Sequence, residues 1–261
     1  MPTLDIFNDD AFSVASLTAA ISEQPYVPGR LGQLGLFESD GITTTTAQIE
    51  KRVEGLGLVA AGERGQSGQA VGGDDRQLIP VNATHLPERS TILADEVQNV
   101  RAFGSETEEE QVQRIINRRL AKMRRQLDAT LEWQRAGAIK GQILDADGSV
   151  LVDIFSAFDL TQQTVAMKLG TADTDVRQKA LGAKRQSEDA LGAAPYSGMR
   201  AFCGEGFFDA LVSHSDVKDA YARWQDGEML RNDPRGGFPF AGVQWEEYRG
   251  SVGGTPFIGS D

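Results

Sequence analysis

The chain has few of the residues on which most catalytic and metal centres are built. Its 261 residues include one cysteine and two histidines. Cys203 therefore cannot form a disulfide within the chain, which fits synthesis in a reducing cytoplasm. His85 and His214 lie far apart in the sequence, and no G-x-S-x-G elbow accompanies them. No run of roughly 18 apolar residues is present either, so the sequence predicts no membrane-spanning helix.

Positive charge is also in short supply. Lys and Arg number 26 against 38 Asp and Glu, which gives a net charge of −12 at pH 7. Binding to nucleic acid or to anionic lipid requires clustered basic side chains, so neither is expected as a primary ligand. Hydrophobic residues make up 40% of the chain, a share typical of globular proteins. The length allows one large domain or two ordinary ones.

The strongest element that the sequence predicts is a long helix over residues 105–137. Ser105 and Glu108 match a capping box at its start, and Gly137 is a natural stop at its end. Its apolar positions recur at three and four residues, as on one face of a helix. They are Val112, Ile115, Ile116, Leu120, Met123, Leu127 and Leu131. At about 31 residues the helix is nearly three times the usual length of about 11–12.

Two β-like runs precede this helix. The first covers residues 42–59 and includes four consecutive threonines, whose β-branched side chains favour a strand. The second covers residues 78–86, and a glycine-rich loop joins the two runs. A two-stranded ribbon of this kind is marginal alone in water, so we expect it to lie on a neighbour, such as another copy of the chain. Residues 1–39 are too weakly apolar for a domain, and we interpret them as an arm that packs elsewhere.

A hairpin and a mixed α/β region are predicted after the long helix. The hairpin covers residues 138–165, with its turn at "DADGS". Residues 173–191 are predicted to be a polar helix, and a short helix follows around Val217, with Ser215 as its cap. The stretch "GVQWEEYRGSVG" is predicted to be a strand and turn.

No motif predicts catalysis, a cofactor or a metal. The "DADGS" turn resembles the start of a calcium loop, but Ser156 stands where the closing glutamate belongs. His214 lies in "SHSD", and we interpret it as a helix-entry or surface residue. Cys203 is interpreted as a small buried hydrophobe, because it is followed closely by Phe207 and Phe208. The arginines on the long helix are best interpreted as a solvated face or as partners of acidic residues.

Three ordered blocks resemble a known family, the lambda-type major capsid proteins of tailed bacteriophages (the capsid protein E family). The segment that opens the family's extended loop is similar to "GRLGQLGLFESDGITTTTAQIE". The family's characteristic stretch after the long helix resembles "FFDALVSHSDVKDAYARW", and the stretch beyond it resembles "FAGVQWEEYRGSVGG". The resemblance covers nearly the whole chain and rests on the sequence and order of these blocks.

The resemblance implies an α+β chain with the Hong Kong 97-like capsid fold. It divides the sequence into an N-terminal arm (1–40), an extended loop or E-loop (41–104), a peripheral domain with the spine helix and hairpin (105–165) and an axial domain (166–261). Relatives continue past the point equivalent to "PFIGSD", so we expect the sequence to be a fragment whose axial domain is incomplete.

The implied function is structural. Copies would form pentamers and hexamers of an icosahedral head around double-stranded phage DNA, and the protein would reside in the virion after synthesis in the bacterial cytoplasm. Portal, scaffold or decoration proteins are the other expected partners, with no membrane, small-molecule substrate or cofactor. Hinges are expected near Gly104 and Gly137. The alternatives are a hydrolase that uses His214 and a cellular nanocompartment shell of the same fold.

Contacts between subunits are expected to involve the ribbon and the basic face of the long helix, where arginines would pair with acidic E-loop residues. The residues predicted for these contacts are Thr43, Thr44, Thr45, Thr46, Glu50, Glu54, Arg114, Arg118, Arg119 and Arg125.

Overall fold

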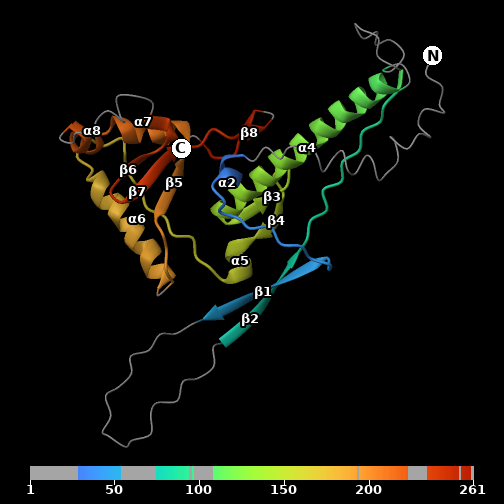
Figure 1. The fold of residues 1–261 in the computed structure, drawn as a ribbon. Helices are drawn as coiled ribbons and strands as arrows, with labels where there is room; N and C mark the ends of the chain where they lie inside the picture. The colour runs from blue at the N-terminus through green and yellow to red at the C-terminus, as the bar shows by residue number, and fades with distance from the viewer. Residues whose placement is uncertain are drawn as a thin grey trace, which may run out of the picture. The chain divides into compact units, whose positions relative to one another are not determined.

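The fold is given by a computed structural model of the chain, in which two compact units are present. The residues that it describes are 29–53, 75–93, 96, 108–192, 194–222, 234–252 and 254–259. One unit takes in residues 1–40 and 84–151, and the other takes in residues 41–83 and 152–261. Both helices and strands are present, as the α+β prediction requires (Figure 1).

The first unit is built on α4, which runs from Glu108 to Lys140. With 33 residues, the helix is about 50 Å long. Figure 1 shows it as one continuous rod. Residues 105–107 lie outside the described part of the chain, so the predicted capping box is not covered. The helix ends at Lys140, and the next residue, Gly141, has a φ of +89°, the left-handed conformation that favours glycine.

Gly137 is therefore not the helix stop that the sequence predicted. It lies inside α4, one turn before the end, where the following strand β3 (Gln142–Leu144) turns back along the helix. A Cβ atom on Gly137 would lie 2.6 Å from the carbonyl oxygen of Gln142 and 3.2 Å from the Cα of Ile143. The absent side chain makes room for the backbone of the hairpin.

The buried face of α4 changes character along its length. Near its start Val112 and Ile116 are buried and pack with Ile92, as the predicted apolar stripe requires. Beyond Leu120 the buried positions include Asp128, Glu132 and Ala136. Leu131, predicted to lie in the stripe, is 40% exposed. The prediction was wrong there because buried carboxylates, which have partners described below, occupy the inward positions.

The predicted hairpin consists of β3 and β4 (Val150–Asp153), and it is shorter than expected. Residues predicted to extend its second strand instead form a short helix, α5 (Ile154–Phe158). Asp153 ends the strand and caps this helix, because its side chain accepts a hydrogen bond from the Ser156 backbone N–H at 3.0 Å. Trp133 ties the hairpin to α4 by donating from its indole nitrogen to the Asp145 carbonyl oxygen at 3.3 Å.

The predicted ribbon consists of β1 (Thr46–Val53) and β2 (Asp75–Asn82), paired antiparallel. Of the four threonines only Thr46 lies in a strand, so the prediction of a strand over the other three was wrong. The hydroxyl of Thr44 donates to the carbonyl oxygen of Thr46 at 2.7 Å. Such a local bond from side chain to backbone competes with extended pairing and favours a bend.

Besides the ribbon and α5, the described residues of the second unit include a three-stranded sheet and three further α-helices. The strands, in the order in which they pair, are β5 (Met199–Cys203), β7 (Val243–Glu247) and β6 (Phe238–Phe240), with β5 parallel and β6 antiparallel to β7. The helices are α6 (Val176–Leu191), α7 (Glu205–Ser213) and α8 (Ser215–Ala222). The shorter elements are a 3-10 turn (Pro234–Gly236), β8 (Ser251–Val252) and β9 (Thr255–Pro256). The predictions of helices over 173–191 and around Val217, and of a strand in "GVQWEEYRG", are confirmed.

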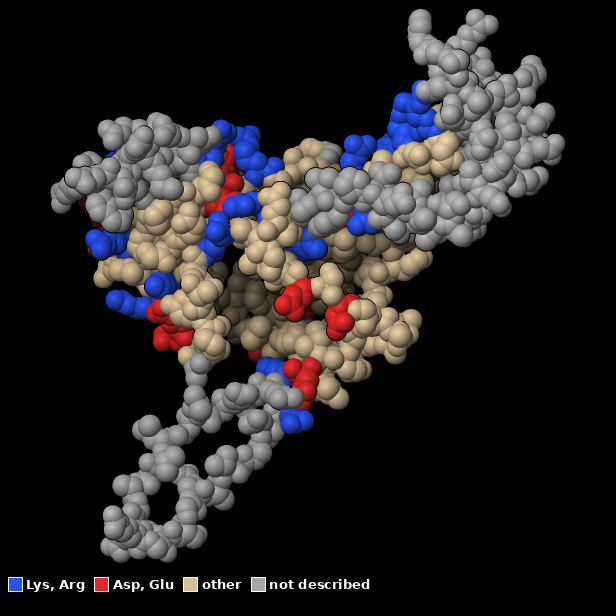
Figure 2. All heavy atoms as spheres, viewed as in Figure 1, with Lys and Arg blue, Asp and Glu red and all other residues tan. Residues whose placement is uncertain are grey.

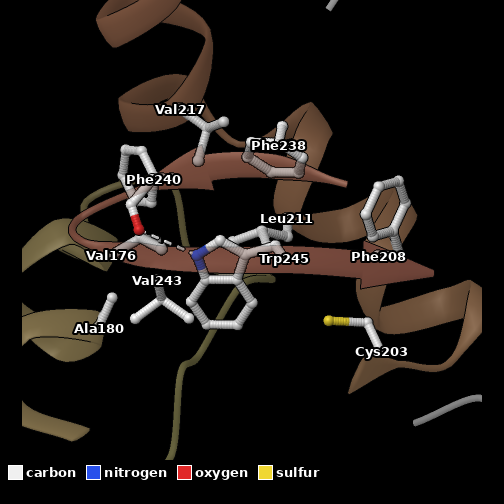
Figure 3. Packing of buried hydrophobic residues seen from close by; sticks show 10 residues of the cluster. All are labelled: Val176, Ala180, Cys203, Phe208, Leu211, Val217, Phe238, Phe240, Val243 and Trp245. Atoms are coloured by element: carbon white, nitrogen blue, oxygen red, sulfur yellow. Dashed lines mark hydrogen bonds between the residues drawn. The ribbon is translucent and has the colours of Figure 1, made fainter. Parts of the chain in front are cut away.

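The apolar core of this unit lies between the sheet and the helices (Figure 3). Trp245 from β7 lies beside Leu211 from α7, and its indole nitrogen donates to the Phe240 carbonyl oxygen at 3.1 Å. Its ring stacks on Phe207, with ring centroids 6.1 Å apart. Phe208 meets Phe238 edge to face, with ring centroids 5.7 Å apart. The one donor of the buried indole is therefore satisfied, and aromatic contacts contribute to the packing of the core.

Candidate functional site

A buried carboxylate on α4 holds the chain segment that precedes the ribbon. Glu132 is 4% exposed, and its Oε1 accepts a hydrogen bond from the backbone N–H of Leu31 at 2.6 Å. Its Oε2 accepts a second one from the N–H of Gly32 at 3.2 Å. These donors belong to α2 (Arg30–Gln33), a single turn of helix. Arg135 lies 3.8 Å from the same carboxylate and offsets its charge.

The fit around this carboxylate is close. Leu31 is 1% exposed. Gly29, directly before α2, lies so near that a Cβ atom there would be 2.2 Å from Cδ of Glu132. Only glycine allows the backbone to approach the carboxylate this closely, so residues 29–32 and Glu132 fit one another as a unit.

A basic side chain on the same helix holds a segment that follows the ribbon. Arg119 donates to the hydroxyl of Ser90 at 3.0 Å and to the carbonyl oxygen of Thr91 at 3.4 Å. It also forms an ion pair with Glu96. One guanidinium thus contacts three residues that follow the ribbon, which its several donors allow. Glu132 and Arg119 are 13 positions apart on α4, about 20 Å along the axis.

The other arginines of the predicted basic face are placed differently from Arg119. Arg114, Arg118 and Arg125 are exposed. Arg124 pairs with Asp128 on the next turn, at 3.1 Å. Figure 2 shows Lys and Arg side chains along the visible face of α4. This face can therefore meet an acidic partner, although Arg119 already has one within its own chain.

The described part of the ribbon carries both apolar and charged surface. Leu78 is 64% exposed and Ile49 is 41% exposed, whereas Ile79 is buried. Glu50 pairs with Arg76 on the adjacent strand at 3.4 Å, and Figure 2 shows charges of both signs in this region. Lys51 donates to the carbonyl oxygen of Phe158 at 2.8 Å, which places a cation at the end of α5, where the helix dipole favours it.

The remaining ribbon positions that were predicted for contacts are only partly covered by the structure. Thr43, Thr44 and Thr45 are exposed and Thr46 is half-buried, with its hydroxyl donating to the Asn82 side chain at 2.9 Å. Glu54 lies outside the described residues. The side chains of Thr43, Thr44 and Thr45 are thus accessible to a partner.

His214 has a structural role in this fold. It lies at the junction of α7 and α8 and is 5% exposed, so the expected helix-entry position is right and a surface position is wrong. Nδ1 accepts from the N–H of Asp216 at 3.3 Å, and Nε2 lies 3.2 Å from the Thr171 carbonyl oxygen. With Nδ1 accepting, Nε2 carries the proton and donates. The imidazole, not the predicted Ser215, therefore caps α8.

The neighbouring Asp216 helps to fix the next helix. Its Oδ2 accepts a hydrogen bond from the Val176 backbone N–H at 2.8 Å, while Asp175 accepts from Gln178 at 2.7 Å. Both carboxylates thus satisfy donors in the first turn of α6. The "SHSD" motif joins helices, and the side chains of His214, Ser215 and Asp216 each have a backbone partner.

Cys203 is buried in the apolar core, as predicted from its neighbours. Burial raises the pKa of the thiol to about 12, so the reactive thiolate is scarce at neutral pH. In the "DADGS" turn, hydrogen bonds from Ser149 lower the pKa of Asp147, whose carboxylate closes the turn. Across the described residues, no group of three or more His, Cys, Asp or Glu side chains is placed to bind a metal ion. None of the helices described is long and apolar enough to cross a membrane.

Sequence reasoning missed Glu132 and the role of Gly29. The contact joins residues about one hundred positions apart, and the sequence around each of them gives no sign of the contact. A glutamate on the inward face of a long helix was the available signal, because a buried charge demands a partner. Its partners are main-chain N–H groups, and because nearly every residue has one, the sequence could not identify which would bind Glu132.

Comparisons with known proteins find relatives over most of the chain. The family described as "Phage major capsid protein E" matches residues 13–261. The major capsid protein of Salmonella phage Felix O1 (isolate Felix O1-VT1) is 26% identical over 257 residues, which cover 92% of this chain and 70% of that protein. The major capsid protein of Pseudomonas phage KPP10 is 27% identical over 260 residues, or 94% and 74% of the two chains. Both names describe structural components and not enzymes. The chain belongs to the phage major capsid protein E family.

Proposed function

We propose that copies of this chain assemble into pentamers and hexamers that build the icosahedral head of a tailed phage around its double-stranded DNA. The observation that carries the proposal is the family match over residues 13–261. Many weak contacts per subunit, each repeated in every copy, would make the closed shell far more stable than any single contact.

The proposal includes the Hong Kong 97-like fold and its division of the chain. In this scheme residues 1–40 form the arm, residues 41–104 the E-loop, residues 105–165 the peripheral domain around α4, and residues 166–261 the axial domain. A single helix of 33 residues suits a spine, and the compact sheet-and-helix core suits a separate domain.

The ribbon supports contact between copies. Two strands alone are marginal in water, and Leu78 and Ile49 leave apolar surface open to solvent. Burying Leu78 on a second copy would gain roughly 1.5–3 kcal/mol per subunit. Thr43 to Thr46 add β-branched surface beside it, and Glu54 is assigned to the same interface.

The basic face of α4 is the other proposed surface. Arg114, Arg118 and Arg125 are exposed and can pair with acidic groups of a neighbouring copy. Arg114, Arg119 and Glu50 already have interactions within the chain, so any role of theirs between copies would add to those contacts.

Portal, scaffold and decoration proteins are further proposed partners, and packaged DNA would meet the inner face without sequence preference. A net charge of −12 suits a wall that encloses DNA without gripping it. Location in the virion after synthesis in the host cytoplasm follows from the same proposal.

The two alternatives have weaker support. A hydrolase using His214 would need a ring nitrogen available for proton transfer, but both nitrogens contact backbone groups and the side chain is buried. A cellular nanocompartment of the same fold would enclose protein cargo, whereas the family that matches is one of phage proteins.

The test of the proposed function is electron microscopy of the purified chain by negative staining, together with sedimentation. Closed shells of uniform diameter are the expected result. Nucleic acid content after nuclease treatment distinguishes a DNA-filled head from a shell with protein cargo. A stable monomer under all assembly conditions would refute the proposal.

A charge reversal on α4 tests the proposed interface. Arg118→Glu removes an exposed cation that has no described role within the chain, so we expect loss of shells with solubility retained. Arg185→Glu on α6 is the matched control, since it makes the same change at an exposed position outside the proposed interface. Normal shells from Arg118→Glu would exclude this arginine from the contact.

A further inference from the structure

We propose that Glu132 is the positioning residue that fixes the path of the N-terminal arm for assembly, by holding residues 29–32 against the spine helix. This inference rests on the proposed function for its assembly part. Its structural part concerns contacts within one subunit.

The described part of the arm contains one very short helix. α2 is one turn long, and its N-cap residue, Gly29, has no side chain with which to cap the turn. A single turn does not persist in water, because helix nucleation is unfavourable and only propagation repays it. Glu132 supplies what is missing: two acceptor oxygens directed at two adjacent backbone N–H groups.

Both the charge of the Glu132 carboxylate and its two acceptor oxygens suit it to bind the N–H groups of residues 31 and 32. A hydrogen bond to an ionised acceptor is about twice as strong as one between neutral groups. The two oxygens accept from successive residues, so a side chain with one acceptor cannot replace it. Gly29 provides the clearance, and the buried Leu31 excludes water from the bonds.

The contact has a consequence for direction. Main-chain N–H groups of residues 31 and 32 have a fixed orientation relative to the chain, so binding both to one carboxylate fixes where the chain leaves α4 on either side. An arm that left each subunit in a variable direction could not make the same contact in every copy of a symmetric shell.

The neighbouring buried acid gives a matched control. Asp128 lies one turn before Glu132 and is 7% exposed, yet its described partner is Arg124 on the same helix. Glu132→Gln and Asp128→Asn therefore remove the same charge from the same buried face. Only the first affects an acceptor of the backbone of residues 31 and 32.

The first measurement is amide hydrogen exchange of the soluble, unassembled chain. In Glu132→Gln we expect exchange in residues 31–32 to be about 10–100-fold faster, because one N–H faces a donor in place of an acceptor. Residues 112–127 should exchange as in the wild type, and Asp128→Asn should leave residues 31–32 unchanged. Unchanged exchange in Glu132→Gln would overturn the proposal.

A second pair of variants approaches the contact from the other side. Gly29→Ala places a methyl group against the Glu132 carboxylate, and it should speed exchange in residues 31–32 to a similar degree. Gly41→Ala is its control, since a Cβ atom there has open space. The double variant Gly29→Ala/Glu132→Gln should be no faster than either single one, because both break one contact. Additive effects would contradict this.

Assembly is then scored by microscopy for the same variants. Glu132→Gln and Gly29→Ala should give few closed shells, whereas Asp128→Asn and Gly41→Ala should give normal ones. Faster exchange combined with normal shells would overturn the assembly role. Absence of shells from the wild type would refute the proposed function, while the exchange results would still decide whether Glu132 holds the arm.

Discussion

The cluster of ten buried residues that includes Trp245 contains no charged side chain, whereas the described buried residues of α4 include two carboxylates. In the first case burial of apolar area stabilises the fold whatever the direction of approach. In the second, hydrogen bonds accepted by Glu132 and donated by Arg119 hold particular chain segments in particular orientations. An apolar core makes a domain self-sufficient, while directed polar contacts position extended segments that other molecules can reach.

The largest effect is expected from breaking the apolar core. Phe208 is 2% exposed, and Phe208→Ala should lower the free energy of unfolding of the sheet-containing unit by about 3–5 kcal/mol. Urea denaturation followed by tryptophan fluorescence measures it, since Trp245 lies in the same cluster. Leu191→Ala, at a position 45% exposed, is the control and should change stability by about 0.5 kcal/mol or less. Loss below about 1 kcal/mol in Phe208→Ala would mean that the core is not the main source of stability.

A pair of glycine substitutions sharpens the comparison, because both glycines lie inside helices but in different surroundings. Alanine normally favours a helix over glycine by roughly 0.5–1 kcal/mol. Gly182→Ala in α6 meets nothing within 4 Å and should gain about that amount. Gly137→Ala meets hairpin backbone at 2.6 Å and should instead lose about 1–3 kcal/mol. Equilibrium unfolding of both variants measures the difference, and stabilisation by Gly137→Ala would show that the hairpin can move away at little cost.

A smaller and more local effect is expected from Arg119. Its side chain is 36% exposed, so solvent screening limits its ion pair to about 0.5–1 kcal/mol. Arg119→Gln should therefore leave global stability nearly unchanged and speed amide exchange in residues 84–93. Arg118→Gln, at the exposed neighbouring position, should change neither quantity. If both variants behaved alike, the contacts to Ser90 and Thr91 would not restrain that segment.

The elements with a strong local pattern could be predicted from sequence. The long helix, the helix beginning near Val176 and the strand around Trp245 follow from periodicity and flanking residues. The sequence also places Cys203 in the core, because aromatic residues surround it. Such features are decided by neighbours within a few positions.

Features that depend on contact with main-chain atoms far away in the sequence could not be predicted. Gly137 has the pattern of a helix stop, but the hairpin that passes beside it explains the glycine. Leu131 has the spacing of a buried residue, but the arm segment docks at Glu132 on the next position. In both places a main-chain contact determines the outcome, and main-chain groups are the same in every residue.

The smallest effect that we expect is a dependence of the stability of the apolar core on alkaline pH, through its buried thiol. The thiol of Cys203 titrates at about 12 in the folded chain, raised by burial from an ordinary value of 9.0. Between these values the unfolded chain loses the proton first, so the folded state binds more protons. The thiol's contribution is therefore fully present below pH 9 and is lost as the pH rises toward 12. Cys203→Ala lacks this contribution, so the difference in unfolding free energy between wild type and variant should be constant from pH 6 to 8 and shift against the wild type above pH 9. Urea midpoints of both proteins at matched pH measure it, and lysine and tyrosine titrations cancel in the difference. A difference that stays flat to pH 10.5 would mean that the thiol is more accessible to water than its place beside the β7 strand implies.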